Sequence, residues 1–368
     1  MNFLINTITA WDEPPRCRHQ VASQLAKLHH VVFIEQNKSG TPDIEVVNQG
    51  NNFIRLIPHW PVDHRLRYRL PILNEFYQEF LFKRIKNLSS FEGFKNWEII
   101  NFDFTATRLF KHFYQNRITY YCNDEHVGNA KRSFFLIDHY HKYIENIIVS
   151  SSKLCIATSD YLYNKLQKVN QNTYLITLGA PDDIEENFKV FTNEDKNKRK
   201  IRVAYVGFML PNKLAVDWVL ECSHNRRLEI LLIGPENRAV KRRLAGKGNI
   251  NFMGVKTGRD LYSTLASVNV CICPYDVNKI NPGTTPNKLM LYLSLGKPTV
   301  ITKIPNIESW KFGDRITYVA DKKVQFAQLV EKAFRDDTYG LFEKRLKIAE
   351  GNTWTQKIGQ LISTLHLQ

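Results

Sequence analysis

Short runs of apolar residues recur along the chain, and longer amphipathic stretches separate them. In the first half these runs lie at 2–7, 31–35, 53–57, 98–101, 119–122, 154–157 and 174–177. Helical patterns fall between most of them, notably at 18–28, 73–88 and 134–149. Short buried strands that alternate with helices predict a parallel sheet with crossover helices.

A polar, charged segment at 193–200, NEDKNKRK, interrupts this pattern and has almost nothing to bury. A second series of strands follows it, at 203–206, 229–233, 250–252, 270–274, 299–302 and 317–319. We therefore predict an α/β protein of two Rossmann-like domains, over 1–192 and 199–351. Doubly wound domains bind ligands at the carboxyl ends of their strands, so the active site is expected in a cleft where the two domains face each other.

Composition fits this architecture and adds a charge signal. The chain has 368 residues, of which 51 are basic and 36 acidic, a net charge of +15. Such an excess attracts polyanions, whether nucleic acid, anionic lipid headgroups or phosphorylated substrates. No apolar run reaches the roughly 18 residues that span a bilayer, and the N-terminus lacks the basic and apolar regions of a signal peptide. We expect a cytoplasmic protein.

The six cysteines indicate no metal site. Cys17, Cys122, Cys155, Cys222, Cys271 and Cys273 form no CxxC pair and no cluster with zinc-ligand spacing. We expect them to be buried, unreactive thiols.

The strongest chemical signal is the segment PNKLMLYLSLGKPTV at 286–300, preceded by the loop NPGTT at 281–285. Here Thr285 is predicted to cap a helix that begins at Pro286 and ends at Gly296. Free N–H groups at a helix start bind phosphate, and Lys288 would add a cation in the first turn. On the residues alone, an ordinary strand-loop-helix unit remains equally open.

This segment resembles P-x-K-L-x-E-Y-L-A-x-G-K-P-V-V, the donor-nucleotide segment of GT-B glycosyltransferases. Further similarities keep the order of that family: YVG at 205–207, LLIGP at 231–235, NFMG at 251–254 and CPYDVN at 273–278. The resemblance implies that the donor is bound by Gly207, Lys213, Gly254, Val255, Tyr275, Thr284, Thr285 and Lys288. GT-B enzymes need no bound metal or other cofactor, so none is expected.

The first half is similar to bacterial exopolysaccharide and teichuronic-acid-type transferases. The similar segments are WDEPPRCRHQ at 11–20, YYCNDE at 120–125, ATSDYL at 157–162 and LGAPD at 178–182. Trp354 and the final helix resemble the C-terminal segment of the family, which implies that 352–368 packs back on the first domain.

One departure from the family pattern bears on stereochemistry. Many members carry Glu where this chain has Leu291, and retaining members carry a second Glu where it has Thr284. The pattern is closer to inverting members such as the xanthan-type glucuronosyltransferase, so we favour inversion. An inactive relative stays open as an alternative.

Inversion needs a general base on the acceptor hydroxyl. Asp124 and Glu125 follow the strand at 119–122, and Asp124, the nearer to the strand end, is the first candidate. If Asp124 points into the cleft, Glu125 points elsewhere, because neighbouring side chains diverge. Asp12 and His19, in and after the first loop, are the next candidates. A solvated or capping role is the commoner one for any such carboxylate.

A basic, aromatic stretch at 59–86 includes Arg65, Arg67 and Arg69 among aromatic residues such as Phe76 and Phe82. Such segments sit at membrane interfaces, although a buried helix with solvated charges is equally consistent. Nucleic-acid binding is not expected, because no known motif for it is present.

We therefore predict a glycosyltransferase that uses a nucleotide-sugar, with UDP favoured over GDP or CMP. The acceptor is expected to be a saccharide or a lipid-diphosphate-linked saccharide in surface polysaccharide or glycolipid synthesis. A UDP-sugar epimerase of the same fold and a non-catalytic donor-binding scaffold remain the alternatives, and peripheral contact with an anionic membrane is compatible with the charge.

Overall fold

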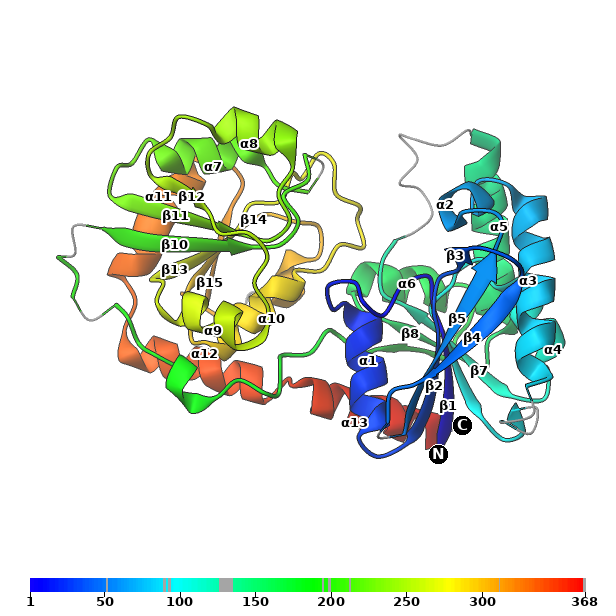
Figure 1. Ribbon diagram of the computed structural model, residues 1–368. Coiled ribbons are helices and arrows are strands. Elements are labelled where there is room, and N and C mark those ends of the chain that lie inside the picture. Colours follow the sequence, from blue (N-terminus) through cyan, green and yellow to red (C-terminus); the bar gives the residue numbers. More distant parts are fainter. Residues whose placement is uncertain are drawn as a thin grey trace. The chain divides into compact units, whose positions relative to one another are not determined.

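A computed structural model describes the chain except for residues 51, 89–90, 92–93, 126–134, 194, 198–199, 212, 311 and 367–368. It divides into two compact units, Met1–Thr177 with Ile358–Gln368, and Leu178–Lys357 (Figure 1). Each unit is built on one sheet with strand-to-strand crossovers. The predicted α/β class with two parallel sheets is confirmed.

The sheet of the first unit has the order β3-β5-β2-β1-β6-β7-β8-β9, with β4 paired to β5. Its strands are β1 (Asn2–Asn6), β2 (His30–Ile34), β3 (Lys38–Ser39), β4 (Asp43–Asn48), β5 (Phe53–Trp60), β6 (Glu98–Asn101), β7 (Arg117–Cys122), β8 (Leu154–Ala157) and β9 (Thr173–Leu175). Within the described chain all pairings are parallel except β4 with β5. The sequence pattern did not predict β3 or β4, because β4 buries only Ile44.

The helices of the first unit lie in the crossovers. They are α1 (Cys17–Ala26), α2 (His64–Arg67), α3 (Pro71–Lys86), α4 (Thr107–His112), α5 (Phe135–Ser151) and α6 (Asp160–Gln167). Pro71 opens α3, where the missing N–H of proline costs no hydrogen bond. The central strands are buried on both faces, as Phe3, Leu4 and Ile5 in β1 show. A parallel sheet covered by helices produces such continuous apolar runs.

The sheet of the second unit has the order β12-β11-β10-β13-β14-β15, and its described pairings are all parallel. Its strands are β10 (Ile201–Val206), β11 (Leu228–Ile233), β12 (Ile250–Phe252), β13 (Val270–Cys273), β14 (Thr299–Thr302) and β15 (Thr317–Ala320). Its helices are α7 (Val216–Ser223), α8 (Arg238–Leu244), α9 (Gly258–Ala266), α10 (Asn287–Ser294), α11 (Lys323–Arg335) and α12 (Tyr339–Glu350), with short 3-10 turns at Glu186–Phe188 and Ile307–Trp310. The final helix, α13 (Trp354–His366), begins in the second unit and ends in the first.

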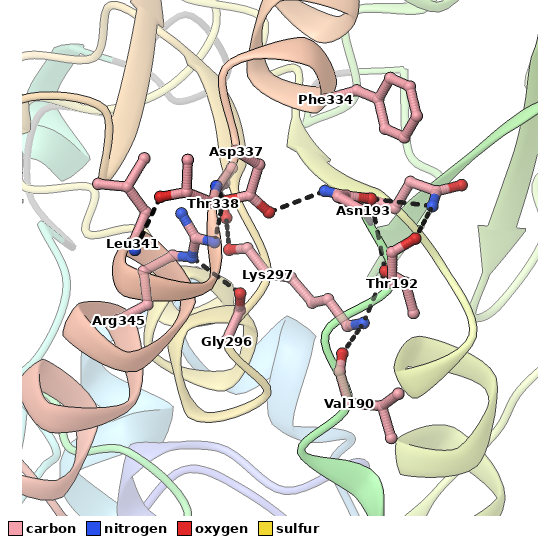
Figure 2. Close-up of polar contacts among 12 residues, drawn as sticks. Val190, Thr192, Asn193, Gly296, Lys297, Phe334, Asp337, Thr338, Leu341 and Arg345 are labelled. Atoms are coloured by element: carbon pink, nitrogen blue, oxygen red, sulfur yellow. Dashed lines mark hydrogen bonds and ion pairs between the residues drawn. The ribbon is translucent and has the colours of Figure 1, made fainter. Parts of the chain in front are cut away.

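The division falls earlier in the chain than the polar segment at 193–200 predicted. The second unit begins at Leu178 and ends at Lys357, and Figure 2 shows how Val190, Thr192 and Asn193 are held there. The Lys297 ammonium donates to the Val190 carbonyl at 2.9 Å and lies 3.3 Å from the Thr192 hydroxyl. Asn193 is buried and donates to Asp337 Oδ2 at 2.8 Å.

The same polar network continues into α12. Arg345, which is fully buried, donates to Asp337 Oδ1 at 2.5 Å and to the Gly296 carbonyl at 2.8 Å (Figure 2). The Lys196 ammonium donates to the carbonyls of Phe334 and Asp337. The polarity of this segment thus serves hydrogen bonds to buried partners, which composition does not distinguish from the polarity of a solvated linker.

Candidate donor and acceptor sites

The loop at 281–286 and helix α10 form one end of the crossover between β13 and β14. The side chain of Asn306 braces the loop by donating to the carbonyls of Pro282 at 2.6 Å and Thr284 at 3.1 Å. Helix α10 begins at Asn287, and Pro286 is its N-cap. The predicted Thr285 cap is wrong, because the Thr285 hydroxyl bonds the Asn287 side chain at 3.1 Å instead.

Lys288, in the first turn of α10, lies between two aromatic rings. Its ammonium is 4.1 Å from the ring centre of Tyr205 and 4.9 Å from that of Tyr275. Burial alone would lower the pKa of Lys288, but interactions with Tyr205, Tyr275 and Cys273 outweigh it and raise that pKa. Aromatic faces attract cations, so the two rings hold the Lys288 ammonium in place.

Three glycines end three neighbouring strands beside this cation. Gly207 follows β10, Gly234 follows β11 and Gly254 lies two residues after β12, all with positive φ. A Cβ on Gly207 would lie 2.7 Å from Cε of Lys288, and one on Gly234 would lie 2.3 Å from the Gly207 carbonyl oxygen. The backbone thus comes closest to Lys288 where only glycine fits.

Helix α10 is tied to the same strand by a residue that the sequence analysis did not single out. The Tyr292 hydroxyl, which is buried, accepts the Val206 backbone N–H at 2.9 Å. Together with Tyr205, it fixes the helix start against the end of β10. The repeated aromatic positions in the quoted segments YVG and KLMLY were the only signal for this contact.

The other predicted donor residues lie around this centre to different degrees. Tyr275 is joined to Leu214 by an isolated bridge, which brings the backbone of the exposed Lys213 to the same end of the sheet. The Thr284 hydroxyl bonds Asn281 Oδ1 at 3.2 Å. Val255 follows Gly254 and has 59% of its surface exposed. The structure therefore brings Gly207, Tyr275 and Lys288 together, whereas Val255 is largely exposed.

In the first unit, Asp124 and Glu125 follow β7 and differ in their surroundings. Asp124 is partly buried, and its Oδ1 accepts the Glu125 backbone N–H at 2.9 Å. Glu125 is buried, and the Lys165 ammonium lies 2.7 Å from its Oε1 and 2.6 Å from Oε2 of Glu145. Glu125 is therefore committed to an ion pair and is a poor proton acceptor for a substrate.

The two candidates in and after the first loop also have structural partners. Asp12 has 74% of its side chain exposed, and the Arg55 guanidinium lies 3.0 Å from its Oδ2. Both ring nitrogens of His19 are used: Nδ1 accepts the Arg16 backbone N–H at 3.1 Å, and Nε2 lies 3.0 Å from the Ala10 carbonyl oxygen. Burial lowers the pKa of His19. A neutral ring with Nε2–H satisfies both bonds, so His19 holds the loop to α1 and has no free nitrogen for a substrate.

The basic, aromatic stretch at 59–86 is divided by the fold. Arg67, Tyr77 and Phe82 are buried, and the Arg67 guanidinium lies over the rings of Tyr68 and Tyr77. Other side chains of α2 and α3 remain at the surface, including the large apolar residues Leu66, Leu70, Ile72 and Phe76. The stretch is therefore partly a buried helix face and partly surface, because one face of α3 packs into the core.

Residues 200–336, almost the whole Rossmann-like part of the second unit, match the family model described as Glycosyl transferases group 1. The chain therefore has the GT-B fold and carries a domain of the group 1 glycosyltransferase type over these residues. The match covers β10 to α11 and includes the glycine-ended strands and Lys288. Group 1 enzymes transfer a sugar from a nucleotide-sugar. No curated protein sequence matches the chain significantly.

Solved structures share the fold over the whole chain at low identity. The sucrose-phosphate synthase of Thermosynechococcus elongatus has a TM-score of 0.73 at 13% identity and covers 100% of this chain and 99% of its own. WaaG, a glycosyltransferase involved in lipopolysaccharide biosynthesis, has a TM-score of 0.68 at 14% identity, and the alignment covers 98% of each chain. Anabaena HepE in complex with UDP and glucose has a TM-score of 0.70 at 11% identity, and the alignment covers 100% of each chain.

Three further observations concern the described residues only. Their His, Cys, Asp and Glu side chains form no group of three or more that could hold a metal ion. No helix in the described chain combines the length and apolarity needed to cross a bilayer. All six cysteines are free and buried, as predicted.

Proposed function

We propose that the protein transfers a sugar from a UDP-sugar to a saccharide or lipid-diphosphate-linked acceptor in bacterial surface polysaccharide or glycolipid synthesis. The observation that carries this proposal is Lys288, a fixed cation at the start of α10 beside the glycine end of β10. A cation and helix N–H groups at one point suit the diphosphate of a nucleotide-sugar. The UDP complex of HepE, which shares the fold, supports uracil as the base.

The transfer proceeds, in this proposal, by a single displacement with inversion. The acceptor hydroxyl attacks the anomeric carbon and gives its proton to Asp124, while the bond to the diphosphate breaks and the released charge is stabilised by Lys288. Thr284 and Leu291 support inversion, since they replace the two carboxylates of the retaining pattern. Asp124 is favoured as the base because Glu125 is paired with Lys165 and both nitrogens of His19 are occupied.

The donor half of the proposal is tested by calorimetric titration with UDP, GDP and CMP. We expect UDP to bind most tightly, and Lys288→Ala to weaken it by about 1–3 kcal/mol, the worth of a hydrogen bond to a charged group. Lys303→Ala, a change of the same type at an exposed lysine of the second unit, is the matched control. Equal UDP affinity in wild type and Lys288→Ala would remove Lys288 from the donor site.

The catalytic half is tested by Asp124→Asn in a transfer assay. Donor affinity should stay unchanged, and turnover should fall by about 10²–10⁴, the usual worth of a general base. Asp12→Asn is the comparison, since Asp12 is the next carboxylate among the candidates. If Asp124→Asn turns over normally while Asp12→Asn does not, the base is Asp12.

We propose in addition that the protein contacts the inner face of an anionic membrane through α2 and the start of α3. The exposed fractions of Leu66, Leu70, Ile72 and Phe76 are 51%, 42%, 73% and 65%. Arg65 and Arg69 are exposed on the same short stretch. Apolar side chains beside arginines suit insertion at a lipid surface with negative headgroups.

This contact is tested by co-sedimentation with vesicles of neutral or anionic lipid. The protein should sediment with anionic vesicles, less so at high salt, and Arg65→Ser with Arg69→Ser should reduce this without changing UDP affinity. Arg67 is left intact in this variant because it is buried. Equal sedimentation with both vesicle types would contradict the proposal.

A further inference from the structure

Arg18 is a buried cation with few partners in the first unit. It lies in the first turn of α1 and only 4% of its surface is exposed. Its Nη1 donates to the Thr9 hydroxyl at 2.7 Å. Its Nε is buried and has no hydrogen-bond partner. Among the described residues, no carboxylate oxygen lies within 4.0 Å of this guanidinium.

The other buried arginines of the described chain are compensated. Arg55 contacts the carboxylates of Glu35 and Asp12. Arg345 contacts that of Asp337. Arg67 lies over two tyrosine rings, 4.5 Å and 3.9 Å from their centres, and bonds the side-chain amides of Asn37 and Asn74. Burying a charge is costly unless it is paired, so Arg18 differs from all three in lacking a partner that offsets this cost.

The position of Arg18 in its helix adds to this imbalance. The first turn of α1 contains no acidic residue, and Arg16, its N-cap, is paired with Glu13 at 2.7 Å. The N-terminus of a helix carries a partial positive charge, which favours anions and disfavours arginine. Because Arg16 is paired and the His19 ring is neutral, Arg18 is the cation at the start of this ten-residue helix that has no carboxylate partner among the described residues.

The surroundings of Arg18 lie at the carboxyl edge of the first sheet. Thr9 follows β1, and Asp124 follows β7. Asp124 attracts Arg18 electrostatically, but from beyond ion-pair distance. The nine residues after Glu125, HVGNAKRSF at 126–134, contain no Asp or Glu. No ion-pair partner of Arg18 is therefore present among the described residues, and residues 126–134 have no carboxylate to supply one.

We propose that Arg18, Thr9 and the first turn of α1 bind a phosphoryl group of the acceptor. The fork of the guanidinium and the helix N-terminus both suit a phosphate oxygen. That the bound ligand is the acceptor rests on the proposed transfer reaction. The existence of an anion site at Arg18 does not depend on it. It assigns to Arg18 a binding role that places a phosphorylated saccharide or a lipid-diphosphate-linked saccharide beside Asp124.

The site is tested directly by calorimetric titration with pyrophosphate. Lys288→Ala serves as the background, because it weakens the proposed donor site, and Arg18→Met is added to it. We expect pyrophosphate binding in Lys288→Ala and at least tenfold weaker binding in the double variant. Arg226→Met, which removes an exposed charge of the second unit, is the control and should leave the affinity unchanged. Equal pyrophosphate affinity with and without Arg18 would overturn the proposal.

Stability of the ligand-free variant separates this site from a structural arginine. Removing an uncompensated buried charge should leave the urea midpoint unchanged or raise it. A lower midpoint for Arg18→Met, or failure to fold, would show that Arg18 is paired within the protein and would contradict the proposal. Arg18→Gln keeps a donor for Thr9 without the charge, so it should fold and still lose pyrophosphate.

A transfer assay then distinguishes the two proposals. If transfer occurs, Arg18→Met should raise the KM for a phosphorylated acceptor at least tenfold and leave the KM for the donor unchanged. A matching rise for an acceptor without phosphate would contradict the assignment of the phosphoryl group. If no acceptor is glycosylated, the proposed function fails, while the pyrophosphate titration still decides the anion site.

Discussion

The replacement of Gly207 by alanine tests whether the end of β10 and Lys288 act together. Gly207 has φ of +141°, a backbone conformation that residues other than glycine rarely adopt. An added Cβ would lie 2.7 Å from Cε and 2.9 Å from Nζ of Lys288, and 3.2 Å from the Tyr205 hydroxyl. Gly207→Ala therefore strains the backbone and displaces the lysine.

Both effects can be estimated from this geometry. An unfavourable backbone conformation costs about 1–3 kcal/mol of folding free energy. The end of the Lys288 side chain is flexible and can move away from the added Cβ. The clash therefore lowers the free energy of unfolding less than it lowers the affinity for UDP. Losing a charged contact with the diphosphate costs about 1–3 kcal/mol, which corresponds to a rise in the UDP dissociation constant of roughly 5- to 150-fold.

The assay pairs calorimetry with UDP and urea denaturation of the same samples. Gly246→Ala is the matched control, because Gly246 has φ of +76° in the same unit but has open space where a Cβ would lie. The control should lose about 1–2 kcal/mol of stability and keep its UDP affinity. A folded Gly207→Ala variant with wild-type UDP affinity would refute the role of Lys288 at the diphosphate.

Three further outcomes follow from buried groups. Lys165→Met should destabilise the protein by about 3–5 kcal/mol in urea, because it leaves the buried carboxylates of Glu125 and Glu145 without their cation; a loss below about 1 kcal/mol would contradict the ion pair. Burial lowers the pKa of His19 from its ordinary value of 6.5. Just below pH 6.5 the imidazole is therefore protonated in the unfolded chain but not in the folded protein. The free energy of unfolding should therefore decrease as the pH is lowered from about 7 to 5, and it should decrease less steeply in His19→Gln. The six thiols are buried, and a thiol reagent should label them only after denaturation; rapid labelling of the native protein would show otherwise.

Much of the architecture follows from local pattern. The strands of the second unit were predicted to within two residues, because a strand covered on both faces must be apolar throughout. The same holds for β1, β6 and β8 in the first unit. Strand β4 escaped prediction because it is an edge strand with one buried residue. The start and end of α10 were also predicted nearly correctly from the proline and glycine that flank it.

The roles of the candidate bases were decided by partners that lie far away in the sequence. Glu125 looks like any carboxylate after a strand until Lys165, 40 residues later, contacts it. His19 loses its candidacy because the Ala10 carbonyl uses the nitrogen that Arg16 leaves open. Sequence spacing places each of these residues on an element but does not say which distant group its polar atoms meet.

By itself, the sequence determined two α/β units, the glycines that end strands of the second sheet, and the helix that carries Lys288. The tertiary structure alone decided that the polar segment around Asn193 belongs to the second unit and that Arg18 is buried without a counter-charge. The physical reason is the same in both cases. A periodic pattern reports which residues must leave water, whereas the cost of burying a polar group depends on its partner, and only the folded chain supplies or withholds that partner.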